Sequence, residues 1–310
     1  MPRVVIALGG NALLRRGEDD TAEALRVNAR LAAEKIADIA AAGWEVVVTH
    51  GNGPQVGRIL LQNEAAREQV QPMPLDVCGA ESQGQIGYLL QVSIGDVFYE
   101  RGMERPVATV LTLTRVPVDD PAFEEPTKPI GPFYDHVEAA GLAAERGWAM
   151  AQEDGGWRRV VPSPRPYSIV EASVIQQLAG TGTIVICAGG GGVPVIEKGP
   201  RLVGVEAVVD KDRAASILAK DVQAEVLLIL TDVPGVYERR GEPDEALLAS
   251  LTLAEADALS RSDSLPPGSM RPKVEAAVSF LRAGGSWAAI GELDQATAVL
   301  AREAGTRIEG

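Results

Sequence analysis

Four short apolar runs in this chain each end directly in a glycine-rich or turn-rich segment, and this pattern limits the fold more than any other feature. The runs are residues 4–8, 46–48, 184–187 and 226–230. Short β-branched runs separated by helical patterns predict buried parallel strands joined by crossover helices, and therefore an α/β fold. The carboxyl ends of parallel strands form the ligand crevice of an open sheet, so we expect the four loops to converge on one site.

The helical pattern between the first two runs is the clearest in the chain. Residues 20–42 place apolar side chains on one face, Asp20 is the expected N-cap with Glu23 three residues later, and Gly43 is the expected stop. Further helices are predicted at residues 82–101, 168–179, 212–221, 252–260 and 272–283.

A proline-rich stretch lies between the predicted strand at 107–113 and the predicted helix at 168. It holds eight of the chain's twenty prolines. A segment of about fifty residues is too long for a plain loop in a compact domain, so the stretch predicts a small inserted subdomain or lid that carries Lys128. The Pro-Pro-Gly-Ser of residues 266–269 predicts a second mobile segment.

Charge and composition exclude several classes of partner. The net charge is −14 and the isoelectric point is near 4.7. An acidic surface does not attract nucleic acid or an anionic membrane, so we expect small-molecule partners. Two cysteines without metal-binding spacing, no apolar run of about 20 residues and no secretory leader predict a soluble, cytoplasmic protein.

Three glycine-rich loops follow the predicted strands. They are Gly9-Gly10-Asn11, Gly51-Asn52-Gly53 and the run of four glycines at 189–192. For a single loop of this kind, a tight strand-to-helix connection is as good an explanation as phosphate binding. The repetition favours backbone N–H groups that cradle phosphate oxygens, with Gly190 and Gly191 among them. The P-loop consensus and the dinucleotide fingerprint are both absent.

Three of the chain's six lysines lie where a phosphate would be held. Lys211 and Lys273 stand at predicted helix starts, where a basic residue is unfavourable unless it faces an anion, and Lys128 stands between prolines in the insert. The alternative is an ordinary helix start, in which Asp210 and Asp212 favour the helix dipole.

Two other motifs carry weaker signals. His50 follows a predicted strand, but a hydrogen-bonded core histidine is the more frequent outcome there, and we do not assign it as a base. Thr231 and Asp232 follow the fourth apolar run, and Tyr237 lies where an aromatic ring could pack on a nucleotide base.

Taken together, the motifs resemble those of the carbamate kinases, in the amino acid kinase superfamily. The matching segments span nearly the whole chain: LGGNA (8–12), THGNGPQVG (49–57), QGQIGY (83–88), PTKPIGP (126–132), GGGGVP (189–194), VDKD (209–212), LTD (230–232) and GSMRPKVEA (268–276). The resemblance implies reversible phosphoryl transfer between carbamoyl phosphate and ADP, which gives ATP and carbamate.

The resemblance also implies an architecture. We expect an open three-layer α/β/α sandwich around a mostly parallel sheet of about eight strands, in a homodimer. The lobe for carbamoyl phosphate would cover about residues 1–206, with a protruding insert at about 115–166, and the nucleotide lobe would cover about 207–310.

Site roles follow from the residues and the resemblance together. Lys211 and Lys273 would neutralise the moving phosphoryl group, Lys128 would reach carbamoyl phosphate, and Asp210 would orient the lysines and a metal-bound water. Mg²⁺ would arrive on the ATP or ADP phosphates, without a protein metal site of its own. The expected substrate contacts are Gly9, Gly10, Asn11, Gly51, Asn52, Gly53, Gly190 and Gly191. The expected nucleotide contacts are Asp212, Thr231, Asp232, Tyr237 and Met270.

Two alternatives stay open at this stage. One is a superfamily kinase for another small acid or phosphate, such as acetylglutamate or isopentenyl phosphate. Such substrates need more volume, and the loops at 9–11 and 51–54 carry no arginine for a second carboxylate. The other alternative is a nucleotide-binding sensor without activity, against which the three lysines argue.

Overall fold

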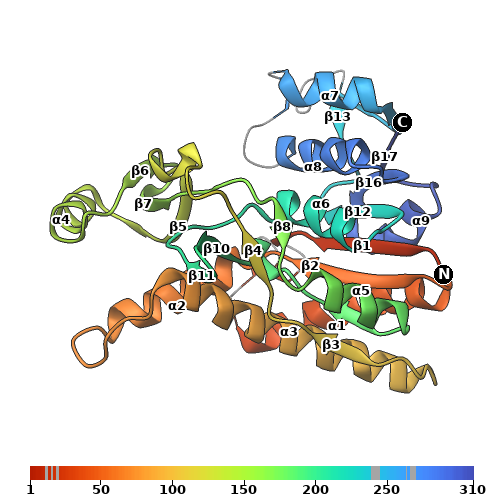
Figure 1. Ribbon diagram of the computed structural model, residues 1–310, viewed down its shortest axis with the longest axis horizontal. Helices are drawn as coiled ribbons and strands as arrows, with labels where there is room; N and C mark the ends of the chain where they lie inside the picture. The colour runs from red at the N-terminus through yellow and green to blue at the C-terminus, as the bar shows by residue number, and fades with distance from the viewer. Residues whose placement is uncertain (11–12, 15–16, 19–20, 239–244, 263, 266–269) are drawn as a thin grey trace.

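A computed structural model describes residues 1–10, 13–14, 17–18, 21–238, 245–262, 264–265 and 270–310. Its centre is an eight-stranded sheet, which confirms the predicted α/β class (Figure 1). The strands in spatial order are β15 (Ser250–Thr252), β17 (Thr306–Glu309), β16 (Trp287–Glu292), β12 (Val226–Thr231), β1 (Arg3–Leu8), β2 (Glu45–His50), β9 (Ile184–Ile186) and β3 (Val107–Thr109).

Nearly all pairings in this sheet are parallel, as the buried β-branched runs predict. Strand β1 pairs in parallel with β2 on one side and with β12 on the other, and among the described pairings only β16–β17 is antiparallel. The four strands predicted from apolar runs are β1, β2, β9 and β12, and they lie next to one another at the centre of the sheet. Their carboxyl ends therefore meet at one edge, where the loops form the site.

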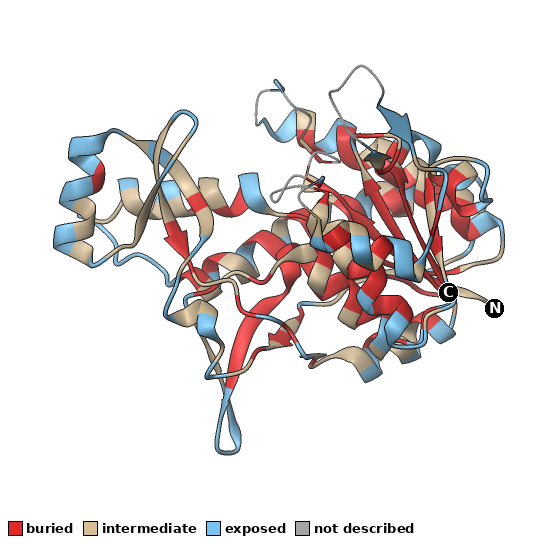
Figure 2. Ribbon diagram, turned by 90° about the horizontal axis from the view of Figure 1, so that it is seen from above, coloured by how far each residue is buried: buried red, intermediate tan, exposed pale blue. Residues whose placement is uncertain are grey.

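Helices cover both faces of the sheet, which confirms the three-layer sandwich. Alternate residues of β1 belong to two apolar clusters, one on each face of the sheet. Ile6 packs in one cluster with Ile36 and Ile86, and Ala7 packs in the other with Leu218 and Val274. Figure 2 shows the sheet as the most deeply buried part of the molecule. The helices of the first face are α1 (Ala22–Ala41), α3 (Leu75–Glu100) and α9 (Ala296–Leu300), and those of the second are α5 (Ala172–Gly180), α6 (Lys211–Asp221), α7 (Leu253–Arg261) and α8 (Arg271–Arg282).

Several predicted boundaries need correction. Thr21 caps α1, because its hydroxyl accepts from the Ala24 N–H, and the predicted cap Asp20 lies outside the described residues. Helix α3 begins seven residues before the predicted start. Ser168 belongs to a strand, β8 (Ser168–Ile169), and the helix begins only at Ala172.

The predicted strand at 107–113 is in fact two strands in different sheets. Strand β3 ends at Thr109, and β4 (Leu113–Arg115) joins a second sheet with β8. The other strands of that sheet are β10 (Val193–Lys198) and β11 (Arg201–Gly204). Strands β13 (Tyr237–Glu238) and β14 (Ala246–Leu247) pair as a small antiparallel ribbon. The 3-10 turns whose bounds lie within the described residues are Pro121–Phe123, Gly189–Gly191 and Leu293–Gln295.

The proline-rich stretch forms a separate unit that protrudes from the sandwich (Figure 1). It contains a three-stranded antiparallel sheet and one helix, and it packs on α2 (Gly53–Ala65) through Ile130 and Val161. Its elements are β5 (Lys128–Tyr134), α4 (His136–Arg146), β6 (Met150–Glu153) and β7 (Gly156–Val161). The expected division into lobes stays a prediction, since one continuous sheet joins strands from both parts.

Candidate active site

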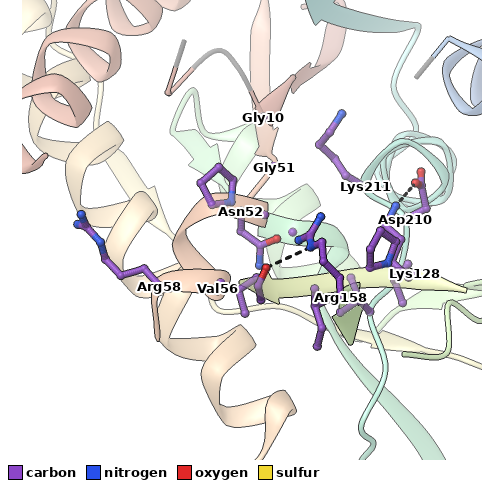
Figure 3. Close-up of a pocket in the computed structure, with 18 of the residues that line it drawn as sticks. Gly10, Gly51, Asn52, Val56, Arg58, Lys128, Arg158, Asp210 and Lys211 are labelled. Carbon is purple, nitrogen blue, oxygen red and sulfur yellow. Dashed lines mark hydrogen bonds and ion pairs between the residues drawn. The ribbon is translucent and has the colours of Figure 1, made fainter. Parts of the chain in front are cut away.

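A cavity of about 730 Å³ lies where the loops after β1 and β2 face the insert and the start of α6 (Figure 3). Most of the predicted site residues meet there. Those that line the cavity are Gly10, Gly51, Asn52, Gly53, Lys128, Gly190, Asp210, Lys211, Asp212 and Lys273. The structure thus brings together all three predicted lysines from distant parts of the chain.

Asp212 holds two of these lysines. Its Oδ1 atom accepts from Lys211 Nζ at 2.5 Å, and its Oδ2 atom accepts from Lys273 Nζ at 3.0 Å. The Asp212 side chain is only 6% exposed. Burial alone would raise the pKa of Asp212, but the two lysines lower it below its ordinary value, so the carboxylate stays charged.

The positions of the two lysines follow from the helices that carry them. Lys211 is the first residue of α6 and Lys273 the third of α8, which confirms that both stand in first helical turns. The two helices pack in one apolar cluster through Ala215 and Val274. Packing of the helices thus brings both ammonium groups to one carboxylate.

Asp210 connects the insert to α6. As the N-cap, its Oδ1 accepts from the backbone N–H groups of Asp212 and Arg213, and its Oδ2 accepts from Lys128 Nζ at 3.0 Å. Burial would raise the pKa of Asp210, but the nearby Lys128 and Lys211 charges lower it to about 2. The carboxylate is therefore ionised at any working pH and can fix Lys128 at the cavity wall.

The backbone N–H groups of the glycine loops fall into two sets, one already hydrogen-bonded within the protein and one not. The N–H groups of Gly9 and Gly51 donate to the carbonyls of Leu230 and Leu8, so these two groups are not available to a phosphate. Within the part of the chain that the structure describes, the N–H groups of Gly10 and Gly190 have no protein acceptor, and both residues line the cavity. Only part of the predicted backbone cradle therefore remains for a ligand.

Packing explains most of the four-glycine run at 189–192. A Cβ at Gly189 would lie 2.3 Å from the His50 ring, and one at Gly190 would lie 2.1 Å from the Asn52 amide. A Cβ at Gly191 would lie 2.4 Å from a backbone carbonyl oxygen. The run therefore has a packing reason of its own, and phosphate binding by Gly190 and Gly191 stays a prediction.

Several predicted contacts lie away from the cavity wall. The residues that do not line it are Gly9, Gly191, Thr231, Asp232, Tyr237 and Met270, and Asn11 lies outside the described residues, as does the segment 266–269. Met270 is buried, whereas Asp232 is exposed and accepts from the Thr231 hydroxyl. Their roles toward a nucleotide stay predictions.

His50 is a core residue. Its ring is buried, and Nδ1 lies 2.9 Å from the Gly51 carbonyl oxygen, to which it donates as the neutral tautomer. Burial lowers the pKa of His50 to about 4. A buried, neutral ring that donates to a backbone carbonyl agrees with the prediction that His50 is a core residue and not a general base.

The lowered pKa predicts how acid affects stability. Below about pH 6.5 the unfolded chain takes up a proton at His50, whereas the folded chain does so only near pH 4, so the free energy of unfolding falls across this window. The slope from this group is at most about 1.4 kcal/mol per pH unit. We expect the melting temperature of His50→Gln to fall less steeply between pH 6.5 and pH 4.5 than the melting temperature of the original chain. Equal slopes would contradict the buried neutral state.

Two arginines in the cavity wall are not among the residues predicted from the sequence. Arg58 comes from α2 and Arg158 from β7 of the insert. Neither belongs to a glycine-rich loop, and arginine is the common basic residue of this chain, so no local signal marked them. The loops at 9–11 and 51–54 carry no arginine, but these two arginines line the same cavity, so the loops alone do not exclude a substrate with a second carboxylate.

A dedicated metal site is not apparent. Among the described residues, no group of three or more His, Cys, Asp or Glu side chains is placed to hold a metal ion. The two acids of the cavity, Asp210 and Asp212, each already bind lysine.

None of the helices in the described ranges is long and apolar enough to cross a membrane.

Comparisons with known proteins agree with this fold. The model of the amino acid kinase family matches residues 2–291. Carbamate kinases of Thermococcus kodakarensis and Halobacterium salinarum are 49% and 50% identical, and the alignments cover 99% of this chain and 99% and 98% of theirs. A solved carbamate kinase from Giardia lamblia bound to AMP-PNP superimposes with a TM-score of 0.94 at 44% identity, over 99% of this chain and 98% of that one. The chain belongs to the amino acid kinase family and, within it, to the carbamate kinases.

Proposed function

We propose that this chain is a carbamate kinase that transfers a phosphoryl group between carbamoyl phosphate and ADP, giving ATP and carbamate. The observation that carries the proposal is the convergence of Lys128, Lys211 and Lys273 on one cavity in a chain whose full-length relatives are carbamate kinases. Transfer to an anionic acceptor needs no general base, since alignment and charge stabilisation account for nearly all of the catalysis. A buried neutral His50 is compatible with that chemistry.

The lysines and the glycine N–H groups of the cavity have proposed roles. Lys211 and Lys273, held in place by Asp212, neutralise the moving phosphoryl group. Lys128 binds carbamoyl phosphate from the insert, and the free N–H groups of Gly10 and Gly190 align the reacting oxygens. The nucleotide contacts Thr231, Asp232, Tyr237 and Met270 remain proposals that rest on the family resemblance.

Magnesium is proposed to enter on the nucleotide phosphates. This ion usually takes one or two protein carboxylates and keeps several waters. Asp210 fits that limited role, because its oxygens already serve Lys128 and the α6 backbone and can at most orient a metal-bound water.

A homodimer in the cytoplasm is also proposed. The outer side of α3 carries exposed apolar side chains, including Tyr88, Val92 and Tyr99, and the neighbouring β3 is an edge strand of the sheet. A second copy of the chain placed there would cover these groups and extend the sheet. Sedimentation equilibrium of the purified chain tests the oligomeric state.

Formation of ATP from ADP and carbamoyl phosphate, followed by a coupled assay, tests the main proposal. A chain that binds ADP without turnover would be the inactive sensor. A chain that phosphorylates acetylglutamate or isopentenyl phosphate faster than it makes ATP from carbamoyl phosphate would be the other kind of kinase.

Lys128→Ala should raise the KM for carbamoyl phosphate about tenfold to a hundredfold, the cost of one charge-assisted hydrogen bond, and leave the Kd for ADP nearly unchanged. The reason is that Lys128 reaches the cavity from the insert. Lys198→Ala, on the exposed β10–β11 hairpin, is the matched control and should behave like the original chain. Calorimetry that shows an equal loss of ADP binding would contradict the assignment.

A further inference from the structure

We infer that Arg158 binds the carbamoyl end of the substrate and stabilises carbamate as it leaves. This inference rests on the proposed function and names a residue to which nothing above assigns a role. Arg158 stands on β7 of the insert and lines the same cavity as the lysines. In Figure 3 its guanidinium lies between Asn52 and Lys128.

The guanidinium of Arg158 is held in place by its neighbours. Its Nε donates to the Gly131 carbonyl at 3.2 Å, its Nη1 contacts Glu153 Oε2 at 3.2 Å, and its Cζ lies 5.1 Å from the centre of the Phe133 ring. Within the described ranges, Nη2 has no protein acceptor. A fixed guanidinium with one unused edge is prepared to bind a ligand oxygen at little entropic cost.

The lysines and Arg158 differ in how their charge is balanced. The ammonium groups of Lys128, Lys211 and Lys273 are paired with the cavity's own carboxylates. Arg158 is paired with Glu153, which does not line the cavity. The cavity wall near Asn52 therefore contains the Arg158 guanidinium, whereas the Glu153 carboxylate that pairs with it lies outside the cavity.

The chemistry requires such a cation away from the phosphoryl group. When the P–O bond to the carbamoyl group breaks, its electron pair stays on that oxygen, while an oxygen of the ADP β-phosphate forms the new P–O bond. Carbamate leaves as an anion, and its charge spreads over both oxygens. No proton moves. A donor at the former carbonyl oxygen meets more negative charge in the transition state than in the substrate, which is the condition for catalysis.

Two ligands separate this role from phosphate binding. Phosphonoacetamide carries both the carbonyl and the phosphonate of a carbamoyl phosphate analogue, whereas methylphosphonate carries the phosphonate alone. We expect the original chain to bind phosphonoacetamide more tightly, and Arg158→Gln to reduce the ratio of the two Kd values at least tenfold. The same variant should lower kcat/KM for carbamoyl phosphate about a hundredfold and leave the Kd for ADP unchanged.

Arg58→Gln is the matched comparison, because Arg58 also lies at the cavity wall but its guanidinium points away from Arg158 in Figure 3. It should change the Kd ratio less than threefold. If Arg158→Gln fails to fold, Arg158→Lys keeps the charge, loses the planar fork and should still reduce the ratio.

An unchanged Kd ratio in the folded Arg158 variants would overturn the inference, and so would an equal loss of affinity for both ligands, which would make Arg158 a phosphate contact. Failure of the proposed function would show differently, as an original chain that makes no ATP from carbamoyl phosphate.

Discussion

Lys211→Ala and Lys273→Ala are each expected to lower kcat by at least about a hundredfold, the usual effect of removing one preorganised charge from a transition state. Both ammonium groups bind the Asp212 carboxylate, so they act at one point of the cavity. The double variant should therefore lose less than the product of the two single losses. Steady-state rates of all three variants in ATP formation provide the measurement.

The control for this series is Lys220→Ala. Lys220 lies in the same helix α6, near its other end, pairs with Asp221 and is 42% exposed, so its loss should change kcat less than twofold. Because the double variant leaves Asp212 buried without a cation, its folded fraction must be measured by thermal unfolding before rates are compared. Fully multiplicative losses in folded protein would mean that the two lysines serve separate steps.

Removal of the insert is expected to abolish most ATP formation while ADP binding persists. Strands β4 and β8 are antiparallel neighbours, with Arg115 opposite Ser168 and the Tyr167 N–H donating to the Arg115 carbonyl. Residues 117–166 can therefore be replaced by an Asn-Gly turn without changing the register. We expect turnover to fall at least about a thousandfold, since the deletion removes two oriented cations and opens the cavity to water.

The ratio of inorganic phosphate to ATP among the products shows whether the insert also excludes water from the cavity, in addition to positioning Lys128. Carbamoyl phosphate hydrolyses in water, so an open cavity should release inorganic phosphate without ATP, whereas Lys128→Ala should keep the original ratio of phosphate to ATP. Deletion also uncovers apolar residues of α2 and α3, including Ile59 and Leu75, and circular dichroism must establish that the variant is folded. Original turnover in a folded deletion variant would contradict the lid role.

The central strands and the convergence of lysines could be predicted from the sequence, because buried parallel strands consist of short β-branched runs and their carboxyl ends meet at one edge. Asp210 and Asp212 were recognisable beside Lys211. The two carboxylates divide the three lysines between them, and this arrangement depends on the packing of α6 on α8 and on the insert. No local pattern encodes such packing.

Other features could not be predicted because the same short sequence pattern occurs in more than one kind of structure. Gly53 and Pro54 suggest a turn, but they begin α2, where proline is tolerated in the first turn. Glycines at 189–192 suggest a phosphate loop, but a Cβ at each of them would collide with atoms from distant parts of the chain, such as the His50 ring and the Asn52 amide. Arg158 lies on β7 of the insert, whose pairing with β5 shifts register between Ile130 and Tyr134, so no regular pattern marks its position.

The central place of β1 has a consequence for synthesis of the protein. Strand β1 is made first, yet its partner β12 follows more than two hundred residues later, with Val4 opposite Val226. At about 5 to 20 residues per second, that interval lasts on the order of 10 to 40 s. During this time one edge of a strand that is apolar from Val4 to Leu8 has no partner, so the nascent chain is exposed to aggregation until its last third leaves the ribosome.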